Sequence, residues 1–377
     1  MTSITAGAFQ DRQSEPSEAR SATRLSSSQN PAVSVLMSVY NDERFIAESM
    51  ESILAQEGPE WEFVIVDDAG TDNSSAILDS YTDRRITLIR HTVNRGLAAS
   101  LNHGLLYCRG RYIARQDGDD ISEPGRIRKQ AAFLEQRPDI AYVGTGLTVI
   151  DEEGRRGRTY MYSDRPEYMR ECIQRLNVPL CHPTLMFRRE ALLAVGGYDE
   201  LFKKSEDYDL HTRLLARFNA SSIREPLVRL RQRGQSMQSG DSSGECLKYV
   251  LFAYARQLAE PEYGSLPRNA ELLLLSEITE WFQRGPLGRC WTASIKRRTA
   301  LESFVQGRRW RGLVGLARAI SQDPAWLADF TLHGQRILLT PTMHRELEAI
   351  IDRVLGALAP FPTGAAQIRQ FSNLNES

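Results

Sequence analysis

Long apolar runs, paired cysteines and net charge are all missing from this sequence. Its 377 residues include no stretch of about 18 apolar side chains, so no membrane-spanning helix is predicted. The 47 basic and 48 acidic side chains nearly cancel, which excludes a bulk field that would draw the chain to nucleic acid. The five cysteines are odd in number and form no C-x-x-C pair, which indicates reduced thiols in the cytoplasm rather than a disulfide framework.

Several motifs that handle nucleotides or supply a nucleophile are missing as well. There is no G-x-x-x-x-G-K-[ST], which excludes a P-loop, and no G-x-G-x-x-G after a predicted strand, which argues against a nicotinamide cofactor. The G-x-S-x-G nucleophile elbow is absent. The segment VDDAGTD (66–72) resembles an aspartate-nucleophile phosphatase loop, but it does not have the D-x-D-G-T order. The chemistry must therefore come from another arrangement of polar residues.

Composition divides the chain into three parts. Residues 1–30 are rich in Ser, Thr, Gln and Arg, which predicts a disordered leader without the apolar core of a signal peptide. Residues 31–240 carry the strand and helix patterns, and residues 241–377 are predicted to be helical after a linker rich in Gly and Ser. The apolar positions of the helical part predict packing against the α/β domain or a second copy of the chain. Its basic, Trp-containing segment 281–311 is either a peripheral contact with an anionic membrane or a solvated basic face.

Apolar strands and amphipathic helices alternate from residue 33 onward. Five apolar runs with β-branched residues predict buried strands. They lie at 33–39, 61–66, 86–90, 111–115 and 140–150. The segments between the first four have the apolar spacing of helices, and the connections are short. This alternation predicts an α/β fold with a doubly wound, mainly parallel sheet.

Polar residues follow three of these strands directly. They are Tyr40 and Asn41, then Asp67 and Asp68, then Asp117, Gly118, Asp119 and Asp120. Ligands of such sheets bind beyond the carboxyl ends of the strands, so we expect all three groups to lie at one edge. The sequence therefore gathers its carboxylates where a ligand binds.

The segment RQDGDD (115–120) places three carboxylates within four positions. Hard cations such as Mg²⁺ and Mn²⁺ prefer oxygen ligands and commonly take one or two carboxylates together with substrate phosphates. A divalent cation would turn the mutual repulsion into coordination, and Gly118 would permit a tight turn or the close approach of a ligand. Because aspartate and glycine also crowd ordinary turns, a solvated turn is the alternative.

The motif does not stand alone. VSVLMSVYN, VIVDDAGTDNS, NRGLAASLNHGL, ARQDGDD, HPTLMFRRE, GGYDE and SEDYDLHTRL follow one another in this order. Together they resemble the signatures of the family 2 glycosyltransferases over roughly Ala32 to Gln238. The resemblance implies a GT-A fold and the transfer of a sugar from a nucleotide diphosphate sugar, with inversion at the anomeric carbon.

The resemblance implies roles for the residues on the nucleotide side. Tyr40 and Asn41 would lie near the base, although Tyr40 could instead pack at the strand end. Asp67 would accept a hydrogen bond from the base, and Asp68 would lie beside it; both could instead cap the next helix. Arg95 would meet phosphate or base, with a solvated arginine as the alternative.

The same resemblance assigns the diphosphate to the D-x-D segment. Asp117 would contact the ribose or the metal, with Gly118 between the two aspartates. Asp119 would bind a divalent cation, Mn²⁺ or Mg²⁺, that bridges the α and β phosphates and offsets the charge of the leaving group. Asp120 is either a third ligand or a neighbour that supports one.

A sugar hydroxyl is a weak nucleophile, so inversion requires a general base opposite the leaving group. Asp207 matches the base of the family, and a helix cap is the alternative role for it. Glu206 and Asp209 are lesser candidates, and Glu206 would otherwise lie on the acceptor side. His182 would line the acceptor side as well, or be a buried structural histidine.

One departure from the family pattern concerns the metal. Many members carry a Tyr-Arg-x-His stretch after the base helix, and its histidine helps to hold metal or phosphate. Here Leu230 and Arg233 stand at the tyrosine and histidine positions. Arginine cannot ligate a cation, but Arg231 or Arg233 could pair with the diphosphate in a bidentate manner.

The resulting hypothesis is an inverting glycosyltransferase that uses a nucleotide diphosphate sugar, with a UDP-sugar favoured. Its acceptor would be a glycan or a lipid-linked sugar in cell-surface polysaccharide biosynthesis. The Q-x-x-R-W pattern of processive synthases is missing, which favours addition of single sugars. A non-catalytic sugar-nucleotide-binding subunit is one alternative. A sugar-phosphate nucleotidyltransferase is another, although the first strand lacks the glycine- and lysine-bearing loop that such an enzyme needs.

Overall fold

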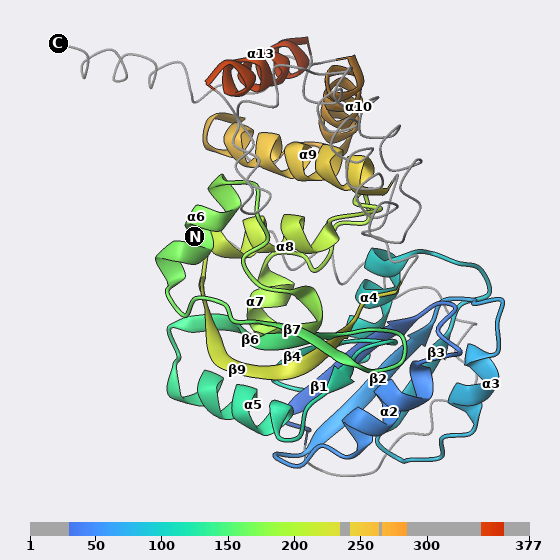
Figure 1. Cartoon of the computed structure of the whole chain (residues 1–377). Coiled ribbons are helices and arrows are strands. Elements are labelled where there is room, and N and C mark those ends of the chain that lie inside the picture. The colour runs from blue at the N-terminus through green and yellow to red at the C-terminus, as the bar shows by residue number, and fades with distance from the viewer. Residues whose placement is uncertain (1–29, 234–241, 264–265, 285–340, 358–377) are drawn as a thin grey trace, which may run out of the picture. The chain divides into compact units, whose positions relative to one another are not determined.

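We analysed a computed structural model that describes residues 30–233, 242–263, 266–284 and 341–357 (Figure 1). The chain divides into two compact units. The first spans Met1–Ile173 and Asn177–Gly234 and contains the sheet, and the second spans Gln174–Leu176 and Gln235–Ser377. The predicted leader, most of the predicted linker and most of the basic, Trp-containing segment lie outside the described residues.

The first unit is built on a sheet in which nine strands are described. They are β1 (Val33–Val39), β2 (Trp61–Asp67), β3 (Ile86–Arg90), β4 (Tyr112–Asp117), β5 (Ile121–Ser122), β6 (Ile140–Ile150), β7 (Arg156–Tyr160), β8 (Met186–Arg188) and β9 (Asn219–Arg231). Their order is β3-β2-β1-β4-β8-β6-β9-β5, with β7 paired to β6. β1 to β4 are mutually parallel, whereas the short β8 runs antiparallel to both β4 and β6. The architecture confirms the predicted α/β class and the predicted parallel half of the sheet.

Helices connect the strands and cover both faces of the sheet (Figure 1). They are α2 (Ile46–Leu54), α3 (Ser74–Asp79), α4 (Leu97–Leu105), α5 (Arg126–Gln136), α6 (Pro166–Gln174), α7 (Arg189–Ala194) and α8 (Glu206–Leu215), with a 3₁₀ turn, η2, at His182–Thr184. The helices of the second unit that are described are α9 (Ser242–Tyr263), α10 (Arg268–Arg284) and α13 (Pro341–Ala357). None of the helices described in either unit is long and apolar enough to cross a membrane.

Alternate residues of β1 and β2 serve opposite faces, as the period of a strand requires. Val35 and Met37 belong to the main apolar cluster, which also takes the buried residues of α2 and α5. On the other face α4 lies so close that a Cβ on Gly104 would be 2.5 Å from Leu36 Cδ1 and 2.9 Å from Val66 Cγ2. A sheet packed on both faces explains why these strands read as continuous apolar runs.

Register places the carboxyl ends of the parallel strands side by side. Val39 pairs with Asp67, Asp67 with Arg90, and Ser38 with Asp117. The chain leaves this edge through strained turns, since Asn41 and Ala69 both have φ of 57°. Ser205, just before α8, has φ of 58°. Non-glycine residues adopt this left-handed conformation at a cost, and such strain is often retained at functional sites.

Candidate functional site

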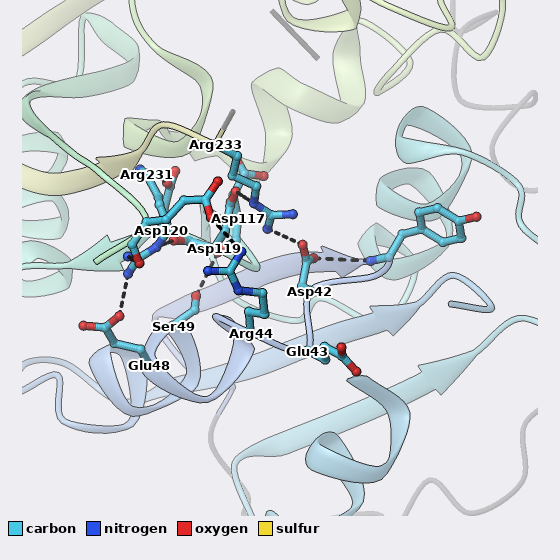
Figure 2. A network of polar contacts seen from close by, with 12 residues as sticks. Asp42, Glu43, Arg44, Glu48, Ser49, Asp117, Asp119, Asp120, Arg231 and Arg233 are labelled. Atoms are coloured by element: carbon cyan, nitrogen blue, oxygen red, sulfur yellow. Dashed lines mark hydrogen bonds and ion pairs between the residues drawn. The ribbon is translucent and has the colours of Figure 1, made fainter. Parts of the chain in front are cut away.

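Four carboxylates meet at the carboxyl edge of β1 and β4. We call Asp42, Asp117, Asp119 and Asp120 the acidic cluster (Figure 2). Gly118 permits the meeting, because a Cβ at this position would lie 2.4 Å from Oδ2 of Asp42. The strand-end pattern predicted the last three of these residues at this edge, but it did not predict Asp42 there. The available signal was its position three residues after the end of β1.

Arg233 bridges two members of the acidic cluster. Its Nη2 donates to Oδ1 of Asp42, and its Nε lies 2.6 Å from Oδ2 of Asp119 (Figure 2). The guanidinium carbon also lies 5.0 Å from the centre of the Phe45 ring, within reach of a cation–π interaction. One cation therefore neutralises carboxylates that come from two different strand ends.

Arg231, two residues earlier, has a different environment. Its Nε donates to the carbonyl oxygen of Asp119, its Nη1 donates to the carbonyl oxygens of Asp151 and Glu152, and its Nη2 lies 2.5 Å from Oε2 of Glu48. Its side chain is 2% exposed. All three guanidinium nitrogens thus have acceptors within the protein, and Arg231 fastens the end of β9 beneath the acidic cluster.

Two buried arginines lie under the acidic cluster. Arg115 Nη2 donates to Oδ1 of Asp117, and Arg126 donates to the carbonyl oxygen of Arg115, to Gln116 and to Ser122. Burial lowers the pKa of Arg126 to about 10, which keeps it charged at neutral pH. These buried charges compensate part of the negative charge that the sequence concentrates at 117–120.

The arginines do not compensate all of the negative charge, and the pKa values of the aspartates in the acidic cluster are raised. Burial, reinforced by the charge of Asp117, raises the pKa of Asp119 to about 6. Burial also raises the pKa of Asp42, and it raises that of Asp120 well above the ordinary range, with the charge of Asp119 as the next cause. Oδ1 of Asp120 accepts the backbone N–H of Arg231, while its buried Oδ2 has no hydrogen-bond partner among the residues that the structure describes. The acidic cluster therefore stabilises added positive charge.

The donor set fits a divalent cation that is shared with a phosphate ligand. In the part of the chain that the structure describes, no group of three or more His, Cys, Asp or Glu is arranged to hold a metal ion by itself. Arg115 engages one oxygen of Asp117 and Arg233 engages one oxygen of Asp119, so a cation would share these two carboxylates with arginines. One or two carboxylates are enough for Mg²⁺ when phosphates complete its coordination.

The end of β2 supplies two buried aspartates with different environments. Asp67 Oδ2 accepts the Ser75 hydroxyl at 2.5 Å and lies 3.6 Å from Nε of Arg90. Its Oδ1 is buried and has no hydrogen-bond partner among the described residues. Such an oxygen can accept a hydrogen bond from a ligand, as expected for Asp67 from the sequence.

Asp68 is engaged inside the protein. Oδ1 accepts the backbone N–H of Arg95 at 2.9 Å and lies 2.7 Å from Nδ1 of His91, while Oδ2 accepts the N–H of Gly96 at 2.9 Å. The His91 ring continues the chain, with its Nε2 2.7 Å from Nδ1 of His103. Asp68 therefore shapes the loop that carries Arg95, a role the sequence analysis did not foresee.

The other residues expected on the nucleotide side border the same edge. Tyr40 is 46% exposed, so the strand-end packing that was the alternative does not bury it. The side chain of Asn41 accepts the backbone N–H of Thr71 at 2.7 Å and so ties the turn after β1 to the turn after β2. Arg95 is exposed at the start of α4.

The first turn of α8 carries the candidate base. Asp207 Oδ1 accepts the N–H of Tyr208 at 2.7 Å, and burial raises the pKa of Asp207. Burial, followed by the charge of Asp207, raises the pKa of Glu206 to about 8. The charge of Asp117 acts on both carboxyls, which brings α8 into the electrostatic field of the acidic cluster. Asp209 instead pairs with Arg213 through Nε at 2.9 Å and Nη2 at 2.6 Å.

His182 lies in a buried setting. Its Nε2 lies 2.8 Å from the hydroxyl of Tyr198, and burial lowers the pKa of His182 far below its ordinary value. The ring is therefore neutral at physiological pH. Arg115 contributes to this lowering, so the ring lies within reach of the charges under the acidic cluster.

The chain is similar in sequence to known glycosyltransferases. The family model described as glycosyl transferase family 2 matches residues 34–196. EpsE of Bacillus subtilis (strain 168), whose name assigns it to the glycosyltransferases, is 42% identical over 208 residues, which cover 54% of this chain and 73% of EpsE. The O-antigen biosynthesis glycosyltransferase WbnJ of Escherichia coli is 31% identical over 232 residues, which cover 60% of this chain and 89% of WbnJ.

A solved structure shares the fold. It is that of S. aureus TarS residues 1–349 in complex with UDP-GlcNAc, with a TM-score of 0.54 and 17% sequence identity. The match covers 82% of this chain and 94% of the TarS chain. The sheet, the strand-end residues and these relatives point to the same enzyme class, and the chain belongs to glycosyl transferase family 2.

Proposed function

We propose that this glycosyltransferase transfers a sugar with inversion from a UDP-sugar to a hydroxyl of a glycan or lipid-linked acceptor in cell-surface polysaccharide biosynthesis. The observation that carries the proposal is the acidic cluster at the carboxyl edge of β1 and β4, where Arg233 contacts Asp42 and Asp119 and Gly118 leaves room for Asp42. The name of WbnJ and the UDP-GlcNAc complex of TarS support the process and the donor class.

The residues at the strand ends divide the donor between them in this proposal. Asp67 accepts a hydrogen bond from the base through its partnerless Oδ1, and Tyr40 and Arg95 border the same part of the donor. Asp117 and Asp119 hold the divalent cation, Mn²⁺ or Mg²⁺, with the diphosphate. When bound, that cation offsets the charge of the leaving nucleotide diphosphate.

Asp207 acts as the general base. Its carboxylate removes the proton from the acceptor hydroxyl while that oxygen forms a bond to the anomeric carbon. The bond between the anomeric carbon and the phosphate oxygen breaks at the same time, and the electron pair leaves with the nucleotide diphosphate. The raised pKa of Asp207 makes it a stronger base than an ordinary aspartate.

Glu206 does not compete for this role at neutral pH. With a pKa of about 8, its carboxyl group is mainly protonated and can donate a hydrogen bond on the acceptor side. Two neighbouring carboxyls whose environments separate their pKa values commonly divide acid and base roles in this way. His182, neutral and hydrogen-bonded to Tyr198, lines that side without adding charge.

The proposal is tested with Asp207→Asn and a panel of nucleotide diphosphate sugars and glycan acceptors. We expect kcat to fall by about 10²–10⁴-fold, the usual contribution of a general base. The affinity for UDP, measured by calorimetry with Mn²⁺ present, should stay within about twofold, since Asp207 does not contact the nucleotide in this proposal. Full turnover in Asp207→Asn would assign the base elsewhere.

A matched control is Asp209→Asn on the same helix. Asp209 is paired with Arg213, so its replacement should weaken the fold without the selective loss of kcat. Stability measured alongside turnover separates the two effects. Equal losses of kcat in both variants would contradict the assignment of Asp207.

A further inference from the structure

Arg233 follows the end of β9, and its guanidinium is its point of contact with the acidic cluster. Its guanidinium contacts the carboxylates of Asp42 and Asp119 and stacks near Phe45, and its side chain remains 25% exposed. A partly exposed arginine can change partners more easily than a buried one, because its guanidinium still reaches solvent.

Arg231 holds the end of β9 in place while the Arg233 side chain exchanges partners. Its backbone N–H bonds to Oδ1 of Asp120 at 2.8 Å, and its buried side chain binds three carbonyl oxygens and Glu48. Its ring contact with Phe45, at 4.6 Å, adds to this anchor. The end of β9 therefore stays in place when the Arg233 side chain moves.

Arg233 and a divalent cation would share one carboxylate. Asp119 is a ligand of the cation in the proposed function, and Nε of Arg233 lies 2.6 Å from its Oδ2. Two positive charges that contact the same carboxylate repel each other, most strongly where water is partly excluded. The positive charge of Arg233 therefore opposes the entry of a metal ion that arrives without an anionic ligand.

A diphosphate changes this balance. Its oxygens offer the guanidinium a bidentate partner of high charge, and they offer the cation additional ligands. Arg233 can then release Asp119 and pair with phosphate, while the cation takes the carboxylate. The two binding events favour each other because each removes an obstacle to the other.

We propose that Arg233 is a resident cation of the acidic cluster that competes with the divalent ion for Asp119 and is drawn away by the diphosphate of the donor. Metal and donor then bind with positive coupling, and the protein binds metal weakly when no diphosphate is present. This inference rests on the proposed function, because it takes Asp119 as a metal ligand and the diphosphate as part of the donor.

The test measures Mn²⁺ binding by the electron paramagnetic resonance signal of free Mn²⁺, with and without UDP. The full-length protein should bind Mn²⁺ weakly alone and more tightly with UDP. In Arg233→Gln we expect Mn²⁺ alone to bind about tenfold more tightly, a coupling of ordinary size, and the enhancement by UDP to shrink. Arg233→Ala gives a second neutral variant, and Arg233→Lys, which keeps the charge, should bind Mn²⁺ alone as weakly as the parent.

Arg229→Gln is the matched control. Arg229 lies on the same strand and pairs with Glu123 at 3.0 Å, outside the acidic cluster. Its replacement removes the same charge and should leave the Mn²⁺ affinity within about twofold of the parent, because Arg229 pairs with Glu123 rather than with a member of the acidic cluster. If Arg229→Gln also bound Mn²⁺ about tenfold more tightly, the effect would come from net charge and the inference would be overturned.

The outcomes separate the inference from the proposed function. If UDP binds with Mn²⁺ but the neutral Arg233 variants bind Mn²⁺ alone no more tightly than the parent, the competition is refuted and the donor site stands. If the parent protein binds Mn²⁺ equally well with and without UDP, the coupling is refuted. If neither UDP nor a UDP-sugar binds under any metal condition, the proposed donor itself is wrong.

Discussion

Replacing Glu206 with glutamine should change how stability depends on pH. Glu206 is 6% exposed, and its pKa is raised to about 8 from 4.5 by burial and by the charge of Asp207. The folded state therefore keeps a proton on Glu206 at pH values where the unfolded chain has lost it. Between these two pKa values the folded state binds more protons, so the stability that this proton contributes falls as pH rises.

The magnitude follows from the width of that window. Each pKa unit corresponds to about 1.4 kcal/mol, so ionisation of this one group would remove up to about 4 kcal/mol of stability across the three pH units between pH 5 and pH 8. Glutamine has nearly the same shape and cannot ionise. Glu206→Gln should therefore resemble the parent protein at pH 5 and be the more stable of the two at pH 8.

Urea denaturation at several pH values measures the difference. The free energy of unfolding of Glu206→Gln minus that of the parent should increase steadily from pH 5 to pH 8. The exposed Glu190, on α7, supplies the control, since Glu190→Gln should show no such trend. Parallel curves for the parent and Glu206→Gln would refute the reasoning, because they would mean that Glu206 ionises as readily in the fold as in the unfolded chain.

Two further substitutions test how the site is built. Gly118→Ala should lower stability by about 1–3 kcal/mol, because a Cβ would lie 2.4 Å from Oδ2 of Asp42, whereas Gly157→Ala, whose nearest contact is 3.4 Å, should be neutral in thermal denaturation. Equal effects would show that Asp42 shifts freely. His91→Phe removes the side-chain partner of Asp68 and should raise KM for the donor by about 5–20-fold with little change in kcat, since lost positioning of about 1–2 kcal/mol falls on binding. His91→Gln keeps a hydrogen-bond donor and should raise KM less. An unchanged KM in His91→Phe would show that Asp68 and His91 do not position the loop that carries Arg95.

The sequence predicted the parallel strands with accuracy. The runs at 33–39, 86–90 and 140–150 became β1, β3 and β6 with the same bounds. β1 and β6 are buried over most of their length, and a buried strand is marked by its own apolar residues. The strand-end position of the polar residues followed from the same pattern.

Other strands could not be predicted from the local sequence pattern. β5 and β8 have two and three residues, too few to show a period. β9 reads NASSIREPLVRLR, and its register against β6 shifts at Thr145/Gly146 and Gly146/Leu147. Such irregularities interrupt the alternation by which a strand is recognised. These strands form because partners distant in the sequence accept their hydrogen bonds.

Two residues of the site, Arg115 and Asp42, could not be predicted because their positions depend on contacts formed in the folded structure. Arg115 was assigned to the end of a strand, whereas β4 continues to Asp117 and Arg115 is buried at 1% exposure. Local sequence argues against a buried arginine, and only the Asp117 carboxylate and nearby carbonyl oxygens make it tolerable. Asp42 joined the site because Gly118, distant in the sequence, leaves room for it.

The sequence alone determined the α/β class, the glycosyltransferase family and the strand ends at which the carboxylates gather, because apolar periodicity and ordered motifs are local properties. Only the tertiary structure decided which cation meets which carboxylate. Arg233 reaches Asp42 across 191 positions of sequence, and Arg231 reaches Glu48 across 183. Coulomb energies depend on distance in space, so the pairing of these arginines with these carboxylates is set by the fold.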